Sequence, residues 1–154
     1  MKITNKTEVK IDLLNSSLAI QQKKVDTALA AMQQAQESAN AEKGSAEDKF
    51  ESFREQMQID RDMYAKLYDE ASEVLAIIRK IDANKINASA ALGAVVLTDF
   101  QNLFISASLG QIKAGENTFV AVSLSSPIYL ILAGKKKGDR FTFRDKEYKI
   151  QDVF

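Results

Sequence analysis

Residues 11–39 and 50–81 each carry a stripe of mostly apolar side chains at alternating spacings of three and four, the a/d spacing of a coiled coil. The two stripes are mirror images, because matching positions such as Met32 and Met57 have their midpoint between residues 44 and 45. Two antiparallel helices joined by a turn bring such positions face to face. We predict a helical hairpin whose helices, with about 35 residues each, are roughly 50 Å long.

We call the predicted contact line between the two helices the seam. Its members are Ile11, Leu14, Leu18, Gln21, Val25, Ala28, Met32, Ala35 and Ala39 on the first helix, and Phe50, Phe53, Met57, Asp60, Tyr64, Leu67, Ala71, Val74, Ile78 and Ile81 on the second. Two members are polar, with Gln21 facing Leu67 and Asp60 facing Ala28. Register control or partial exposure explains both, and a buried functional carboxylate is the alternative for Asp60.

The turn of the hairpin is predicted near residues 42–48. Gly44 is the only glycine before Gly93, and no proline precedes Pro127, so the helices are interrupted only there. Ser45 followed by Asp48 fits a capping box that starts the second helix. The predicted hairpin domain is therefore residues 1–82.

Composition excludes several classes of function. The 21 basic and 21 acidic residues cancel, so global charge does not favour nucleic-acid binding. The chain has no cysteine and no histidine, which excludes disulfides, thiolate or imidazole metal sites and a Ser-His-Asp triad. Carboxylates, lysines and hydroxyls remain as chemical groups.

No targeting or membrane segment is apparent. Residues 1–10 are polar and lack the apolar core of a signal peptide, and no run of about 20 apolar residues exists to span a membrane. We therefore expect a cytoplasmic protein without a membrane partner, and we expect a monomer.

A second domain follows a linker at residues 83–89 and covers residues 90–154. Short β-rich runs predict strands at 94–98, 102–108, 118–122, 140–144 and 148–153. Ser126 and Pro127 fit the N-cap and first position of a short helix over 128–133, which Gly134 ends. The whole chain is thus predicted to be α+β, a long N-terminal antiparallel coiled-coil hairpin followed by a small β-domain with one short helix.

This architecture, together with Ser126-Pro127-Ile128, Leu132-Ala133-Gly134-Lys135 and Gly138-Asp139, resembles the Gre (GreA/GreB-like) transcript-cleavage factors of bacterial RNA polymerase. Their FKBP-like C-terminal domain starts its helix with Ser-Pro-Ile, ends it with Gly-Lys and has Gly-Asp before the last hairpin. The likeness of architecture covers nearly the whole chain, and the likeness of sequence is confined to residues 122–139. It implies an FKBP-like fold for residues 90–154.

The resemblance implies that core RNA polymerase is the partner. The C-terminal domain would dock at the rim of the secondary channel through Ser126, Pro127, Ile128 and Lys135. The hairpin would pass down the channel, so that its tip reaches the active site and, indirectly, the 3′ end of backtracked RNA. In the family, acidic tip residues help to hold a second Mg²⁺, with which the polymerase hydrolyses that RNA. The protein would be an accessory factor rather than an enzyme, with Mg²⁺ bound only jointly with polymerase and none in isolation.

The tip departs from the family pattern of an Asp, two residues and then Glu-Asn before an aromatic residue. If Phe50 is matched to that aromatic residue, Lys43 and Ala46 occupy the two acidic positions. A shift by one residue puts Glu47 at the glutamate position but Gly44 at the aspartate position, so neither register reproduces the pair. Glu42, Glu47 and Asp48 remain as candidate catalytic carboxylates, and Glu47 and Asp48 as candidate ligands of the shared Mg²⁺. In the structural alternative, Asp48 caps its helix, Glu47 favours the helix N-terminus and Glu42 is solvated.

Two other functions fit the same residues. The first is a regulator that occupies the secondary channel without promoting cleavage, either DksA-like or an inhibitory Gre homologue. The second is a coiled-coil adaptor unrelated to polymerase.

Two further surface features have open interpretations. The basic cluster Lys135–Lys137 with Arg140 is a solvated turn or a contact surface. The apolar stretch Ile128–Leu132 has more hydrophobic surface than one short helix buries.

Overall fold

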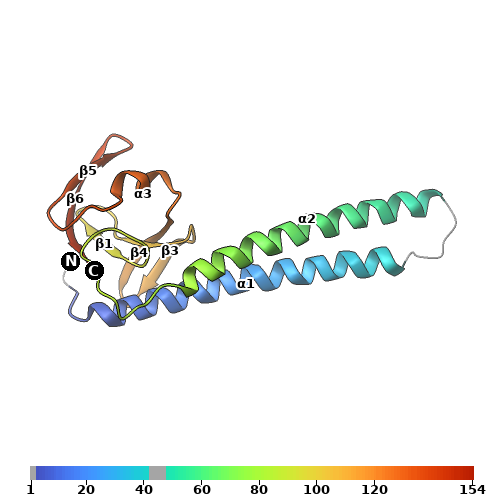
Figure 1. Ribbon diagram of the computed structural model, residues 1–154, viewed down its shortest axis with the longest axis horizontal. Helices are drawn as coiled ribbons and strands as arrows, with labels where there is room; N and C mark the ends of the chain where they lie inside the picture. Colours follow the sequence, from blue (N-terminus) through green and yellow to red (C-terminus); the bar gives the residue numbers. More distant parts are fainter. Residues whose placement is uncertain (1–2, 42–47) are drawn as a thin grey trace. The chain divides into compact units, whose positions relative to one another are not determined.

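The computed structural model describes residues 3–41 and 48–154 (Figure 1). Helix α1 spans Lys6–Ala41 and helix α2 spans Asp48–Arg79, and strands with one short helix follow. The chain divides into two compact units: Gln21–Leu75, here the hairpin unit, and Met1–Ile20 with Ala76–Phe154, here the sheet unit. Each long helix therefore contributes to both units, and the fold is α+β, as predicted.

In the hairpin unit, α1 and α2 run antiparallel to one another (Figure 1). Neither helix contains a glycine or a proline, so nothing in the sequence breaks them. Gln21 of α1 is hydrogen-bonded to Ala71 of α2, whereas Ala39 lines a groove with Arg54. Early residues of α1 thus meet late residues of α2, which confirms the predicted hairpin. The predicted tip at Gly44 and Ser45 lies outside the described residues.

The α1 half of the seam agrees with the sequence prediction within the hairpin unit. Gln21, Val25, Ala35 and Ala39 are all buried. These positions recur at spacings of three and four on one face of the helix, the face that an amphipathic pattern predicts.

The α2 half of the predicted seam is wrong at two positions, while its other described members in the hairpin unit are only partly exposed. Phe53 and Leu67 are 42% and 45% exposed, whereas Arg54, Arg61 and Tyr68, each one residue from a predicted member, are only partly exposed. Both sets keep the three–four spacing around the shared members, so spacing does not distinguish them.

The two polar seam residues have separate explanations. Gln21 is 3% exposed, and its side-chain amide reaches Ala71, one turn further along α2 than the predicted neighbour Leu67. Asp60 is half-buried and accepts a 3.0 Å hydrogen bond from Gln56 of its own helix. Asp60 therefore fits the partial exposure that the sequence suggested, and not a buried functional carboxylate.

The sheet unit contains one sheet with the strand order β3-β4-β2-β1-β6-β5. The strands are β1 (Val95–Thr98), β2 (Leu103–Ser106), β3 (Gly110–Ala114), β4 (Asn117–Ser123), β5 (Arg140–Phe143) and β6 (Lys146–Val153). Strands β2 and β4 pair in parallel, and the other neighbours pair antiparallel. Five strands were predicted near their observed positions, and β3 was missed because only Ile112 and Ala114 alternate inward on this edge strand.

Helix α3 (Pro127–Leu132) packs on the sheet and completes its core. Ile128 and Leu132 join a buried cluster with strand residues such as Ile105 and Ile150. All four residues of β1 are buried, as expected for a strand covered on both faces. The short helix that the sequence predicted after Ser126 is confirmed.

The first turns of α1 belong to the sheet unit and bury a different face from the predicted seam. Leu13 and Ser17 are fully buried, whereas the predicted member Ile11 is 39% exposed. Lys6 forms a 3.0 Å ion pair with Asp152 of β6.

The described residues contain no helix with the length and hydrophobicity of a membrane span.

Candidate functional site

The predicted tip carboxylates fall at or beyond the edge of the described residues. Glu42 and Glu47 lie outside them, and Asp48 is the first residue of α2, with its side chain not described. Their joint role in catalysis and in Mg²⁺ binding therefore stays a prediction. Among the residues that the structure describes, no group of three acidic side chains is placed to hold a metal ion.

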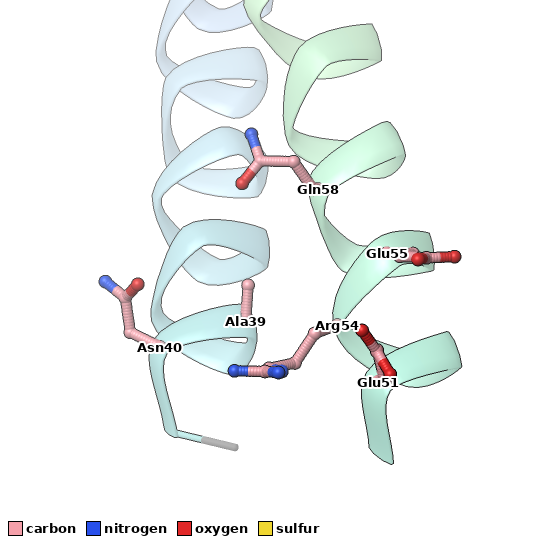
Figure 2. A pocket seen from close by; sticks show the side chains of 6 residues that line it. All are labelled: Ala39, Asn40, Glu51, Arg54, Glu55 and Gln58. Atoms are coloured by element: carbon pink, nitrogen blue, oxygen red, sulfur yellow. The ribbon is translucent and has the colours of Figure 1, made fainter. Parts of the chain in front are cut away.

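An open groove of about 320 Å³ lies between the end of α1 and the start of α2, within the hairpin unit. Its lining residues come from the last turn of α1 and the first turns of α2; they are Ala39, Asn40, Glu51, Arg54, Glu55 and Gln58. Figure 2 shows Arg54 and Gln58 directed across the groove towards α1, and Glu55 directed away from it. The groove is thus polar on its α2 side and contains one cationic side chain.

Arg54 is the one basic side chain among the described lining residues, and sequence reasoning missed it. Its Nε is buried and has no hydrogen-bond partner. Arg54 lines the groove where the sequence predicted its neighbour Phe53 to face α1. The spacing of apolar residues does not distinguish these two positions.

The predicted polymerase-binding residues at the start of α3 have identifiable structural roles. The Ser126 hydroxyl accepts a 3.4 Å hydrogen bond from the Tyr129 N–H and donates a 2.7 Å bond to the Ser123 carbonyl. Pro127 is the first residue of the helix, where a missing N–H costs nothing. Ile128 is buried in the core. Two of the three, Ser126 and Ile128, therefore stabilise the helix that a partner would contact.

The exposed part of α3 was not singled out by the sequence motif. Leu130 and Ile131 are 71% and 41% exposed, the surplus apolar surface that the stretch 128–132 suggested. Lys135 follows, half-buried, with its carbonyl accepting a 2.8 Å hydrogen bond from the Ala90 N–H. Lys136 and Lys137 are exposed next to it. Apolar and basic groups thus adjoin in sequence at the end of α3, a composition suited to a protein partner with acidic residues.

Lys10 is a buried cation, and no pattern in the sequence singled it out. The residue is 1% exposed, and its ammonium donates a 2.5 Å hydrogen bond to the Lys85 carbonyl. Burial, only partly offset by the charge of Asp82, lowers the pKa of Lys10 from 10.5 to about 8, and the positive charge of Lys85 acts in the same direction as burial. Within the sheet unit, this bond ties the first turns of α1 to the loop after α2.

Comparison with known proteins gives a distant structural likeness. No protein-family model matches the chain, and no curated protein matches it. Among solved structures, that of the transcription factor Gfh1 is 16% identical and has a TM-score of 0.33, with the match covering 99% of this chain and 96% of that one. A match at this level assigns no role to any residue of this chain.

Proposed function

We propose that this protein is an accessory transcription factor that binds RNA polymerase and stimulates cleavage of backtracked RNA. The observation that carries the proposal is the antiparallel hairpin, whose helices have 36 and 32 residues and whose turn is flanked by acidic residues. At 1.5 Å per residue these helices are about 50 Å long, a reach suited to a deep channel. The resemblance of residues 122–139 to Gre factors supports RNA polymerase as the partner.

In this proposal, polymerase performs the reaction and the hairpin delivers oxygen ligands to it. Glu42, Glu47 and Asp48 would help to hold a Mg²⁺ shared with polymerase. Carboxylates suit this ion, which often takes only one or two of them besides water and phosphate. When bound, the ion polarises the phosphate and activates water. The described carboxylates Glu51 and Glu55 are exposed one or two turns into α2 and add negative charge to the same end of the hairpin.

We assign the contact with RNA polymerase to the end of α3. The exposed Leu130 and Ile131 supply the apolar contact, and Lys135 with its basic neighbours supplies charge. Ser126 and Ile128 hold the helix in place for that contact. The polymerase-binding motif is thus divided into residues that touch the partner and residues that position them.

A pull-down with core RNA polymerase tests docking. The Leu130→Glu variant should bind at least tenfold more weakly, because it places a charge in the apolar contact. Ile86→Glu is the matched control, since Ile86 is also exposed, at 52%, in the sheet unit but lies outside α3. Equal binding by both variants and the wild type would remove α3 from the interface. No binding by the wild type would favour the adaptor without polymerase.

One observation favours a second candidate, occupation of the channel without cleavage. Arg54 places a guanidinium in the groove at the start of α2, and a positive charge at this end of the hairpin opposes a metal cation. The acidic pair of the Gre tip is also not reproduced in the sequence. A protein of this kind would bind polymerase through the same α3 contact and leave its RNA intact.

A further inference from the structure

The segment between α2 and the sheet, residues 82–90, is attached more firmly than its composition predicts; we call it the connector. Its small and polar residues are typical of a linker, which the sequence indicated over 83–89. In the structure, however, Ala83, Asn87 and Ala90 are all buried. The whole connector belongs to the sheet unit, so these side chains pack against that unit.

One end of the connector is bonded to the chain that leaves α3. The Ala90 N–H donates a 2.8 Å hydrogen bond to the Lys135 carbonyl, and the Gly134 N–H donates a 2.9 Å bond to the Ala90 carbonyl. Ser89 and Lys136 continue this contact as an antiparallel bridge. Buried backbone groups need their partners, so the connector and the end of α3 cannot separate without losing these bonds.

The other end of the connector is bonded to the first turns of α1, which also belong to the sheet unit. The buried Lys10 ammonium donates a 2.5 Å hydrogen bond to the Lys85 carbonyl. The Lys85 N–H donates a 3.1 Å bond to the Asp82 carbonyl, so the accepting residue lies within a hydrogen-bonded turn. A buried ammonium that loses its acceptor carries a large desolvation cost, so this contact resists opening.

The two attachments are close together along the chain. Only four residues separate Lys85 from Ala90, and one of them, Asn87, is itself buried. The connector therefore has little slack to absorb a displacement at either end. We propose that the connector couples the end of α3 to the base of α1, so that loosening either attachment loosens the other. Such a coupling is reciprocal, because it is a free energy shared by the two attachments.

Amide hydrogen exchange of the full chain, followed by NMR, tests the coupling from the α3 side. Gly134→Ala strains that attachment, because Gly134 has a φ of 76° and its N–H bonds Ala90. The Lys85 N–H, at the other attachment, should then exchange at least about threefold faster. Gly115→Ala is the matched control, since its φ is 62° but it lies in the turn between β3 and β4. Equal exchange at Lys85 in the two variants overturns the proposal.

The reverse experiment loosens the α1 side. Lys10→Met removes the bond to the Lys85 carbonyl, and the Gly134 N–H should exchange at least about threefold faster. Lys6→Met is the control, because it removes a cation from the same helix whose partner, Asp152, lies in β6. Circular dichroism checks that both variants stay helical. Exchange at Gly134 that is unchanged by Lys10→Met also overturns the proposal.

A consequence for transcription rests on the proposed function. A polymerase that binds the end of α3 would, through the connector, hold the base of α1 more firmly. Lys10→Met should therefore bind polymerase like the wild type, because the exposed residues of α3 are unchanged, but stimulate RNA cleavage at least about threefold less. Full stimulation by Lys10→Met contradicts this consequence. A wild type without stimulation rejects the proposed function instead, and the exchange measurements still decide the coupling.

Discussion

The side-chain amide of Gln21 on α1 donates a 2.9 Å hydrogen bond to the backbone carbonyl of Ala71 on α2. Gln21 is buried among apolar seam residues, so its amide has no access to bulk water once the helices pair. A polar group in such a place is costly in any register that leaves it without an acceptor. The bond therefore fixes how α1 and α2 are aligned in the hairpin unit.

Replacing Gln21 tests this role. Gln21→Ala should lower the free energy of unfolding by about 1–2 kcal/mol, since it removes the hydrogen bond and leaves a small cavity. Gln21→Glu should cost more, because a buried carboxylate would face a carbonyl oxygen. Urea denaturation measures both, with Gln22→Ala as the neighbouring control. A Gln21→Glu variant as stable as the wild type would show that water reaches this position.

Lys10 predicts a dependence of stability on alkaline pH. Its pKa is lowered from 10.5 to about 8 by burial, so between these values the unfolded chain binds a proton that the folded chain does not. The free energy of unfolding should therefore rise as pH increases from about 8 to 10.5 and show no contribution from Lys10 below that window. We expect a rise of about 1–2 kcal/mol, less than the full shift implies because the loop carrying Lys85 is exposed to water.

The Lys10→Met variant isolates this effect from other groups that titrate at high pH. The difference in unfolding free energy between wild type and variant should change between pH 8 and 10.5 in favour of the wild type. Equilibrium denaturation at several pH values gives that difference. A difference that is constant across the window would mean that the Lys10 ammonium is as well solvated in the folded chain as in the unfolded one.

Gly93 is predicted to be irreplaceable for two reasons. Its φ is 87°, and a Cβ built there would lie 2.9 Å from the Ile81 Cγ2. Gly93→Ala should therefore destabilise the sheet unit by about 2–4 kcal/mol through backbone strain and a clash with a buried side chain. Gly110→Ala is the matched control, since φ is 75° but nothing lies within 4 Å of the added carbon; about 1 kcal/mol is expected. Thermal denaturation should separate the two variants clearly.

Part of this fold followed from the sequence, and the parts that did not have physical causes. The hairpin and α3 were predictable because helix periodicity, the absence of Gly and Pro in the long helices and the Ser126-Pro127 cap all act locally. The exposure of Phe53 and Leu67 was not predictable, because Arg54 and Tyr68, one residue further on, fit the same spacing of three and four. Strand β3 was missed because its inward pattern spans only two residues.

The candidate site shows the same division. The motif at the start of α3 was visible in the sequence. Which side chains of α3 enter the core was not, and the structure shows Ile128 buried and Leu130 exposed. Arg54 and Lys10 gave no sequence signal, because an isolated basic residue on a helix is usually solvated. Their burial depends on contacts with residues far away in the chain.

The measurement that tests the proposed function most directly is RNA cleavage in a stalled, backtracked elongation complex at saturating Mg²⁺. The wild-type protein should release short 3′ RNA fragments faster than polymerase alone. The double variant Glu47→Ala, Asp48→Asn should bind polymerase like the wild type, yet stimulate cleavage at least 100-fold less, a loss of about 3 kcal/mol of transition-state stabilisation. Asn at position 48 removes the negative charge while largely preserving the shape of the side chain. A wild-type protein that binds the complex and never accelerates cleavage contradicts the account and favours occupation of the channel without cleavage.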